Sequence, residues 1–336
     1  MTGHDAAPVL VTGAAGFIGG HVAARMARAG RSVVALDLPG RSWSHLGDAL
    51  VDRREGDIAD EAGLQRALSG ASAGTVVHCA ALMGSAAPEA IHRANVIGTR
   101  NIGAWAASAK ATRFIYLSSV TVHGLVPARG IDEDTPFARI GMAYADSKMD
   151  AESEVARLHH QGIRWSILRP GDVYGPRAGE WVDKLVSAMR QGRMVLVGGG
   201  TGLVNITHVD NLTDAIQAAL GTPAAAGRVY LITDGEPVTW KRYLEALAAA
   251  AGCKAPSRSI PGWIARPATF ALESAGRLTG WRPPITRLGL RILTARCSYS
   301  IERARRELGW SPRVTFEAGM EEIGRWLRAQ AGSSRG

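Results

Sequence analysis

A tyrosine and a lysine four residues apart, in the string Tyr144-Ala145-Asp146-Ser147-Lys148, could together perform proton transfer. Residues at this spacing share one face of a helix. A phenol is a poor acid or base near neutral pH, because its reference pKa is about 10. A neighbouring ammonium favours the phenolate and would lower that pKa, so that the tyrosine can act as a general acid or base. A solvated helix face explains most such pairs, so the rest of the chain must decide.

A glycine-rich turn near the start of the chain supports a chemical role for this pair. The apolar run at 9–11 predicts a buried strand, and Gly13-Ala14-Ala15-Gly16-Phe17-Ile18-Gly19 leads from it into a helix. Gly13 would permit the tight turn, Gly16 the approach of a pyrophosphate, and Gly19 close packing of helix on strand. Free N–H groups at the helix N-terminus would bind the phosphates. The alternative is an ordinary strand–helix turn with incidental glycines.

Asp37 ends the next predicted strand, 32–37. It follows the glycines by roughly the 20 residues expected for the acid that binds a ribose 2′-hydroxyl in dinucleotide sites. A carboxylate accepts hydrogen bonds from a free ribose but repels a 2′-phosphate, so the sequence favours NAD over NADP. Arg41 lies four residues further on and could bind a phosphate or be a surface loop residue.

Further short motifs occur along the chain in a fixed order. They are Gly56-Asp57-Ile58, His78-Cys79-Ala80-Ala81, Asn95-Val96-Ile97-Gly98-Thr99, Ser118-Ser119-Val120-Thr121-Val122-His123-Gly124, Arg169-Pro170-Gly171-Asp172-Val173-Tyr174-Gly175-Pro176 and His208-Val209-Asp210-Asn211. With the glycine turn and the Tyr-x-x-x-Lys spacing, they resemble the motifs of the extended short-chain dehydrogenase/reductase family, within the NAD-dependent epimerase/dehydratase superfamily. The resemblance runs over nearly the whole chain.

The resemblance implies that Ser119, Tyr144 and Lys148 are catalytic. Ser119 would donate a hydrogen bond to the substrate oxygen, Tyr144 would move the proton, and Lys148 would lower the tyrosine pKa and bind the nicotinamide ribose. Thr121 is a second hydroxyl that could assist or be a β-branched loop residue. The chain departs from the family at His123, where a tyrosine is usual, and we interpret His123 as a structural variation.

The same resemblance implies a set of residues that bind NAD, with NADP the less favoured cofactor. They are Gly13, Ala15, Gly16, Phe17, Ile18, Gly19, Asp37, Asp57, Ile58, Ala80, Ala81, Asn95, Tyr144, Lys148, Pro170 and Val173. No metal site is predicted. The three cysteines, Cys79, Cys253 and Cys297, have neither a disulfide framework nor zinc-site spacing.

Strands and helices alternate through the first two thirds of the chain, which predicts an α/β fold with a doubly wound parallel sheet of the Rossmann type. Strands are expected at 9–11, 32–37, 75–80, 113–119, 164–169 and 228–232, and helices at 17–29, 60–69, 89–109, 143–161, 181–191 and 211–220. The dinucleotide-binding domain should cover 1–170, with 204–234 returning to it. A smaller, mostly helical substrate lobe should take 171–203 and 235–331.

The substrate lobe limits the choice of reaction. The segments Pro283-Pro284-Ile285-Thr286-Arg287 and 299–312 resemble 3β-hydroxysteroid dehydrogenase-type members, which implies a secondary alcohol or ketone on a bulky, hydrophobic substrate. A nucleotide-sugar 4-epimerase or dehydratase is the main alternative. Asp172 and Val204-Asn205 count against it, because many such enzymes have an asparagine and an Arg-Asp pair there. A minor alternative is a non-catalytic regulator that senses NAD, although such relatives usually lose the tyrosine or lysine.

Most of the net charge of +9 lies in one part of the chain. Residues 251–310 hold eleven Lys and Arg against three Glu, interspersed with apolar residues such as Trp263 and Phe270. Basic and apolar residues together predict a possible peripheral membrane contact through 251–296, a lid over the substrate, or a solvated arginine-rich surface. No nucleic-acid partner is predicted, because stacking aromatics and a binding motif are missing.

Three further expectations concern the whole molecule. The polar first residues, Met1 to Ala7, lack a signal-peptide pattern, and with no 18-residue apolar stretch this predicts a cytoplasmic protein. The partner is expected to be a small-molecule substrate. The alanine-rich helices 89–109 and 143–161 allow close packing, and in this family such helices often pair across a dimer, so a homodimer is expected.

Overall fold

Seven parallel strands form the central sheet of the computed structural model, which describes residues 7–84, 86–125, 128, 130–279 and 285–333. The order across the sheet is β11-β6-β5-β4-β1-β2-β3. Their bounds are β1 Val9–Thr12, β2 Val33–Asp37, β3 Asp52–Glu55, β4 Thr75–His78, β5 Arg113–Leu117, β6 Arg164–Pro170 and β11 Arg228–Ile232. The predicted α/β fold with a doubly wound sheet is confirmed.

Six of these strands match the predicted ones, and one was missed. β3 has the sequence Asp-Arg-Arg-Glu and lies at the edge of the sheet, paired with β2 alone. Charged side chains are common on edge strands, where they discourage pairing with other chains. Because the prediction relied on apolar runs, it could not find a strand of this kind.

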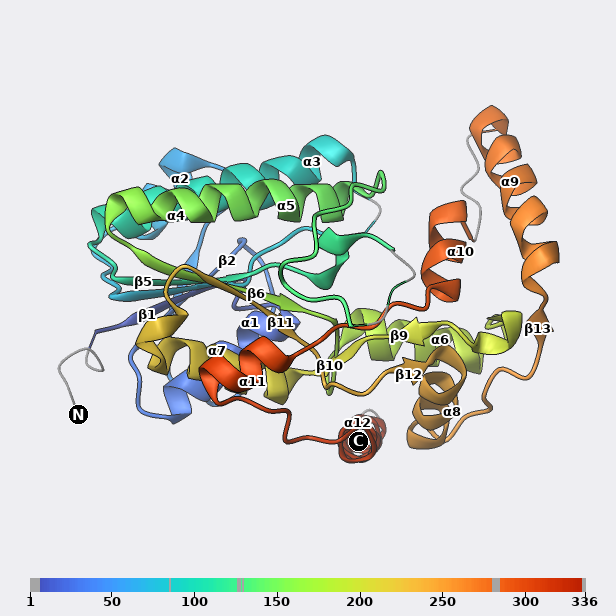
Figure 1. The fold of residues 1–336 in the computed structure, drawn as a ribbon. Helices are drawn as coiled ribbons and strands as arrows, with labels where there is room; N and C mark the ends of the chain where they lie inside the picture. Colours follow the sequence, from blue (N-terminus) through green and yellow to red (C-terminus); the bar gives the residue numbers. More distant parts are fainter. Residues whose placement is uncertain (1–6, 85, 126–127, 129, 280–284, 334–336) are drawn as a thin grey trace.

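Helices cover both faces of the sheet (Figure 1). On one face α1 (Phe17–Arg28), α7 (Val209–Gly221) and α11 (Glu302–Leu308) enclose a core with Val11, Val77 and Ile216. On the other face α2 (Glu61–Ala67), α4 (Gly98–Ser108) and α5 (Ala143–Ala156) enclose a core with Leu10, Phe114 and Ile102. α3 (Pro88–His92) continues into α4 through a π-helical stretch, Arg93–Ile97, so the predicted helix 89–109 is continuous but not regular.

The C-terminal part of the chain forms a third core beside the sheet, around Val186, Trp240, Leu247 and Ile323. Its helices are α6 (Lys184–Arg190), α8 (Trp240–Ala250), α9 (Gly262–Thr279), α10 (Arg287–Thr294) and α12 (Phe316–Ser333), with short strands β7 (Asp172–Tyr174), β8 (Leu196–Val197), β9 (Leu203–Val204), β10 (Ile206–His208), β12 (Val238–Thr239) and β13 (Ser259–Ile260). This core draws on both segments of the predicted substrate lobe. However, Ile301, Leu308 and Trp310 pack into the core below the sheet, although that stretch was predicted to lie in the lobe.

Two segments used in the sequence predictions lie outside the residues that the structure describes. The polar residues 1–6 and the first two residues of the C-terminal motif, Pro283 and Pro284, are outside the described part. None of the described helices is both long and apolar enough to span a bilayer.

Candidate active site

The strand order creates a natural binding crevice where β1 and β4 lie side by side. The chain proceeds from β1 to β2 and β3 on one side of this point, and from β4 to β5 and β6 on the other. In open parallel sheets, ligands bind beyond the carboxyl ends of the strands at such a reversal of strand order. The glycine turn after β1 and the Ala80-Ala81 loop after β4 meet there.

The turn after β1 is shaped so that only glycine fits at its start. Gly13 has φ +68°, and a Cβ atom built on it would lie 2.8 Å from the Ala80 backbone nitrogen. The turn is closed by a hydrogen bond of 3.0 Å from Gly16 N–H to the Gly13 carbonyl oxygen. The two loops therefore approach each other closely beneath the crevice.

The N-terminus of α1 fits a dinucleotide pyrophosphate. Gly16 is exposed, Phe17 and Ile18 are half-buried, and no acidic residue lies in the first helical turn. Unpaired N–H groups and the helix dipole favour an anion at this position. The predicted residues Gly16, Phe17 and Ile18 thus lie where phosphates would be held, and Gly19 packs against the turn from inside the helix.

Asp37 at the end of β2 is tied to the glycine turn. Its Oδ2 accepts a hydrogen bond of 2.9 Å from Ala15 N–H, and its Oδ1 accepts one of 2.7 Å from Leu38 N–H. Asp57, after β3, accepts a hydrogen bond of 2.8 Å from Ala59 N–H at its Oδ1. Both carboxylates therefore lie at the β2–β3 side of the crevice. The sequence predicted contacts with the ribose and the adenine at this side.

A buried hydrogen-bond network holds the loop after β4. The Ala80 N–H donates to Thr12 Oγ1 at 3.2 Å, and the Thr12 hydroxyl lies 2.6 Å from His78 Nδ1. His78 Nε2 lies 3.0 Å from Thr99 Oγ1, whose proton goes to the Asn95 carbonyl oxygen at 2.6 Å. Burial lowers the pKa of His78 to about 3, so its ring is neutral and donates through Nε2. The network fixes Ala80, while Ala81 beside it is exposed.

Three hydrogen bonds within the protein hold the Asn95 side chain, and its predicted contact with the cofactor stays a prediction. Its Oδ1 accepts a hydrogen bond of 2.7 Å from Leu82 N–H, and its Nδ2 donates to the Leu82 carbonyl oxygen at 3.0 Å and to Ser147 Oγ at 2.9 Å. An amide group has two N–H donors, and both are used within the protein. The side chain therefore connects the loop after β4 to α5 and leaves no donor for a cofactor.

Ser119, Tyr144 and Lys148 come together at the carboxyl end of β5. Ser119 follows that strand, and the helix α5 brings Tyr144 and Lys148 to it on one face. Lys148 is buried, its Nζ donates to the Leu117 carbonyl oxygen at 2.7 Å, and it lies 5.8 Å from the centre of the Tyr144 ring. The Ser119 hydroxyl is close enough to Tyr144 to favour its phenolate by hydrogen bonding. The three residues that the sequence predicted to be catalytic therefore form one cluster.

Thr121 orients Ser119. Both the Thr121 N–H, at 3.2 Å, and the Thr121 hydroxyl, at 2.9 Å, donate to Ser119 Oγ. Since the Ser119 oxygen accepts twice from one side, its own proton is left to point elsewhere, which suits a donor to a substrate oxygen. Thr121 therefore assists by positioning the Ser119 hydroxyl group.

The pKa of Tyr144 does not follow the prediction. Burial, which is the largest cause, and the charge of Asp172 raise it to about 12, although a hydrogen bond with Ser119 lowers it. Burial also lowers the pKa of Lys148 to about 8. The prediction of a lowered tyrosine pKa was wrong for this structure, because desolvation of the phenol is the largest influence and outweighs the hydrogen bond with Ser119. Tyr144 therefore holds its proton at neutral pH.

A buried ion pair below the site was not recognised in the sequence. Arg169 of β6 donates to Glu152 of α5 through Nε at 2.9 Å and through Nη2 at 2.7 Å, and the Ser118 hydroxyl donates to Glu152 Oε1 at 2.5 Å. Arg169 Nη1 also donates to His123 Nε2 at 3.1 Å. Burial, then Arg169, lowers the pKa of His123 to about 4, so His123 is a neutral, buried partner, in agreement with its structural interpretation.

Removing Glu152 should destabilise the protein strongly. Glu152→Ala leaves the Arg169 guanidinium buried without its partner, and breaking a buried pair in this way costs about 3–5 kcal/mol. Urea denaturation measures the change in the free energy of unfolding. The matched control is Asp150→Ala on the same helix, which breaks an exposed ion pair with Arg139 and should cost about 0–1 kcal/mol. Equal losses in the two variants would contradict a supporting role for the buried pair.

Pro170 and Val173 lie at the same edge of the sheet. Pro170 ends β6, and Val173 lies in β7, which pairs with β10; both residues are buried. Their predicted contact with the cofactor stays a prediction.

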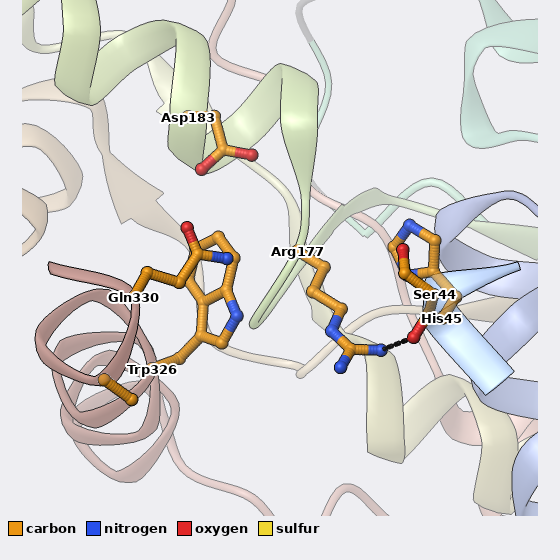
Figure 2. A pocket seen from close by; sticks show the side chains of 7 residues that line it. Ser44, His45, Arg177, Asp183, Trp326 and Gln330 are labelled. Carbon is orange, nitrogen blue, oxygen red and sulfur yellow. Dashed lines mark hydrogen bonds between the residues drawn. The ribbon is translucent and has the colours of Figure 1, made fainter. Parts of the chain in front are cut away.

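A separate cleft lies away from these residues. It has a volume of about 450 Å³ and is lined by Ser44, His45, Arg177, Asp183, Trp326 and Gln330 (Figure 2). Arg177 Nη1 bridges it by donating to the Ser44 carbonyl oxygen at 2.6 Å. None of the predicted catalytic or cofactor residues lines this cleft.

One histidine and two carboxylates lie close together elsewhere in the described part of the chain. His208, Asp210 and Glu322 have possible ligand atoms within 4.8 Å of one another. His208 Nδ1 accepts from Asp210 N–H at 3.3 Å, so Nε2 carries the proton and faces Glu322 at 3.4 Å, while Asp210 pairs with Arg25. The cluster is thus a network of protein partners.

The sequence and the fold resemble proteins of known activity. The family model of the NAD dependent epimerase/dehydratase family matches residues 9–233. The chain is 32% identical over 327 residues to a 2-alkyl-3-oxoalkanoate reductase of Stenotrophomonas maltophilia, covering 94% of this chain and 98% of the relative. It is 28% identical to a mouse (Mus musculus) sterol-4-alpha-carboxylate 3-dehydrogenase, decarboxylating, covering 93% and 86%.

A solved structure agrees with this relationship. The dTDP-glucose 4,6-dehydratase DesIV of Streptomyces venezuelae, with NAD and TYD bound, superposes with a TM-score of 0.78 at 26% identity, covering 97% of this chain and 98% of that one. The curated relatives named as a reductase and a dehydrogenase confirm the prediction of an oxidoreductase of the extended short-chain type. The chain belongs to the NAD-dependent epimerase/dehydratase family.

Proposed function

We propose that this oxidoreductase interconverts a secondary alcohol and a ketone on a bulky, hydrophobic substrate, with Tyr144 as the acid and base. The observation that carries the proposal is the cluster of Ser119, Tyr144 and Lys148 beside the crevice at the carboxyl edge of the sheet. The names of the relatives, a reductase of 3-oxo acids and a sterol 3-dehydrogenase, support an alcohol or ketone rather than a sugar nucleotide.

Each residue of the cluster has a distinct task. In reduction Tyr144 gives its proton to the ketone oxygen and becomes a phenolate. In oxidation the phenolate form of Tyr144 takes the proton of the alcohol and becomes the neutral phenol. Ser119, oriented by Thr121, donates a hydrogen bond to that oxygen in both directions. Lys148 lies behind the phenol, and its charge stabilises the phenolate form that exists after transfer.

The cofactor proposed for the crevice is NAD. Gly13, Gly16 and the first turn of α1 would hold its pyrophosphate, and Asp37 its adenosine ribose. When bound, it supplies the hydride acceptor or donor for the carbinol carbon. The N–H groups of Ala15 and Leu38 hold the Asp37 carboxylate in place, and a carboxylate at this position favours a free 2′-hydroxyl over a phosphate.

Replacing Asp37 should reverse the cofactor preference. The wild type should use NAD at a higher kcat/KM than NADP. In Asp37→Ala the hydrogen bonds to the ribose and the repulsion of a 2′-phosphate are both lost, so we expect kcat/KM with NAD to fall by about 10–100-fold. The value with NADP should stay equal or rise. Arg41→Ala is the control, because it lowers turnover with NADP only if Arg41 binds the 2′-phosphate. A wild-type preference for NADP would contradict the assignment of NAD as the cofactor.

The epimerase alternative has its own signature. A nucleotide-sugar epimerase oxidises and re-reduces its substrate, so a UDP-sugar would give product without net NADH. We expect no such product, because many nucleotide-sugar enzymes have an asparagine near the diphosphate at this position, and this chain has Asp172 instead. A regulator that binds NAD without catalysis would give turnover with neither class of substrate.

The oligomer we propose is a homodimer through the outer faces of α4 and α5, which lie side by side on one side of the sheet (Figure 1). Ala145 and Ala151 are buried within the protomer, so the surface left for a partner includes Arg100, Ala104 and Ser153. Light scattering on purified protein should give the mass of two chains.

A peripheral membrane contact through α9 is also proposed. This helix packs against α10 and projects from the body of the molecule (Figure 1). Trp263 is 76% exposed and Phe270 58% exposed, and both lie seven residues apart on one face, with Arg266 between them. An exposed apolar face with flanking arginines suits an anionic lipid surface. The lipid surface would also hold a hydrophobic substrate.

Liposome sedimentation tests this contact. The wild type should sediment with vesicles of phosphatidylcholine and phosphatidylserine more than with phosphatidylcholine alone, and Trp263→Asp/Phe270→Asp should abolish the difference. Leu50→Asp, at a residue 93% exposed on a distant loop, is the matched control and should bind like the wild type. Binding that is unchanged by the α9 substitutions would rule out this surface.

A further inference from the structure

Tyr299 lies next to the turn that holds Ser119. Its hydroxyl group donates a hydrogen bond of 3.3 Å to the Val120 carbonyl oxygen, and the residue is only 9% exposed. The ring belongs to a small apolar cluster with Val120, Ile131 and Cys297. Burial raises the pKa of the Tyr299 phenol, so the hydroxyl group keeps the proton that it donates. A buried hydroxyl group is therefore directed at the backbone beside the predicted catalytic serine.

Backbone hydrogen bonds on both sides fix the place of Tyr299. It lies in the segment 295–301, which crosses from α10 to α11 (Figure 1). The Ile131 N–H donates to the Ser298 carbonyl oxygen at 2.9 Å, and the Ser300 N–H donates to the Ile131 carbonyl oxygen at 2.8 Å. The segment thus pairs with the chain that follows the Ser119 turn, and its backbone sets the position of the Tyr299 ring.

The peptide unit that Tyr299 contacts is the one that holds the Ser119 hydroxyl group. The Val120 carbonyl and the Thr121 N–H belong to the same planar peptide unit, so its oxygen and its hydrogen point in opposite directions. On the side away from Tyr299, the Thr121 N–H donates to Ser119 Oγ at 3.2 Å. A hydrogen bond at the Val120 oxygen therefore fixes the direction of a hydrogen bond that Ser119 accepts.

Hydrogen bonds in such a series strengthen one another. A carbonyl oxygen that accepts a hydrogen bond polarises its peptide, which makes the N–H of that peptide a better donor. Likewise, a hydroxyl oxygen that accepts a hydrogen bond becomes a better donor through its own proton. The series runs from the Tyr299 hydroxyl through the peptide of Val120 and Thr121 to Ser119. Its last proton is that of Ser119, which the proposed function directs at the substrate oxygen.

We propose that Tyr299 is a positioning residue for the reaction: it acts through the peptide of Val120 and Thr121 to hold the Ser119 hydroxyl group and to strengthen the hydrogen bond that Ser119 donates to the substrate oxygen. The inference rests on the proposed function, in which Ser119 stabilises that oxygen. Negative charge develops on the oxygen in the transition state, so the contribution of Tyr299 is larger there than in the bound substrate. Its loss therefore lowers kcat more than it changes KM.

Tyr299→Phe tests the proposal, because it removes one hydroxyl group and keeps the buried ring. Turnover would be measured with NADH and two hydrophobic ketones, a 3-oxosteroid and the methyl ester of a 3-oxo fatty acid. We expect kcat to fall by about 3–10-fold, the effect of one lost hydrogen bond, while KM and NAD affinity stay within about twofold of the wild type.

Tyr243→Phe is the matched control. Tyr243 is buried in the core of the C-terminal part, and its hydroxyl group donates to the Trp181 carbonyl oxygen at 2.8 Å. Each variant loses a hydrogen bond from a tyrosine to a backbone carbonyl, so thermal denaturation should show a lower melting temperature for both. Only Tyr299→Phe should lower kcat, which separates a role in the reaction from a role in stability.

A double-mutant cycle with Ser119 shows whether Tyr299 acts through that residue. Ser119→Ala should lower kcat by about 10²–10³-fold, the range for the loss of one donor to a developing oxyanion. Adding Tyr299→Phe to Ser119→Ala should change kcat by less than about twofold, because the group through which Tyr299 acts is already gone. A general loosening of the fold would instead lower kcat by the same factor with and without Ser119.

The outcomes are distinguishable. A kcat of Tyr299→Phe within about twofold of the wild type, or an equal loss with and without Ser119, overturns the role of Tyr299 and leaves the oxidoreductase intact. An unchanged kcat in Ser119→Ala overturns the task assigned to Ser119 and this inference with it. Absence of NADH oxidation with both ketones, while NAD binding is normal, overturns the proposed function itself.

Discussion

Replacing Tyr144 with phenylalanine is expected to lower kcat by about 10²–10⁴-fold, the range that a positioned acid or base contributes. The substitution removes one oxygen from a half-buried ring and leaves its packing on α5 in place. NAD affinity should change by less than about threefold, because the glycine turn, Asp37 and the N-terminus of α1 are untouched. The measurement is NADH absorbance for turnover and titration calorimetry for binding.

Tyr230→Phe is the matched control for this variant. Tyr230 lies in β11, and its hydroxyl donates to Glu307 on α11, away from Ser119 and Lys148. It should keep nearly full activity. Activity of Tyr144→Phe within a factor of ten of the wild type would mean that another group moves the proton.

Adding a single methyl group at Gly19 is expected to abolish cofactor binding. A Cβ atom on Gly19 would lie 2.2 Å from the Gly13 carbonyl oxygen and 2.6 Å from the Gly13 carbonyl carbon, and both neighbours are backbone atoms. The helix and the turn must therefore move apart, at a cost of about 1–3 kcal/mol in the free energy of unfolding. The displaced turn no longer presents its N–H groups to the pyrophosphate, so NAD affinity should fall at least tenfold.

Gly221→Ala is the control for that effect. Gly221 ends α7, and a Cβ atom there would meet no other atom within 4 Å. Thermal denaturation with and without NAD should give the wild-type shift for Gly221→Ala and no shift for Gly19→Ala. A full NAD-induced shift in Gly19→Ala would show that the turn is not the pyrophosphate site.

The parts of the fold that the sequence could predict are those governed by local patterns. β1, β2 and β4 are short apolar runs followed by turns, and burial on both faces requires such runs in a parallel sheet. β3 escaped prediction because its charged side chains reflect its place at the edge, which is a property of the whole sheet. The two-residue strands β8, β9, β12 and β13 depend on contacts between distant segments, so no local pattern marks them.

The site shows the same division. The spacing of Tyr144 and Lys148 predicted their common helix face, and the family motif pointed to Ser119, which the structure brings next to Tyr144. The pKa of Tyr144 could not be obtained from spacing, because it depends on how deeply the phenol and the ammonium are buried. The ion pair of Glu152 and Arg169 joins residues on different elements, and only the way α5 crosses β6 brings them together.

Asn95 illustrates a limit of resemblance to a family. Its motif marks a residue beside the loop after β4, but the motif says nothing about which atoms its amide contacts. The hydrogen bonds to Leu82 and Ser147 make it a connector between the loop after β4 and α5. Loss of Asn95 would thus act on cofactor binding through the loop that holds Ala80.

Transfer of a labelled hydride tests the central claim most directly. The purified protein would be given NADH deuterated at the transferable C4 position together with a bulky, hydrophobic ketone such as a 3-oxosteroid, and the products would be analysed by mass spectrometry. The account predicts deuterium on the carbinol carbon with the wild type, and formation of that product about 10²–10⁴-fold more slowly with Tyr144→Phe. Unlabelled alcohol, or a product formed from a sugar nucleotide without any net oxidation of NADH, would contradict it.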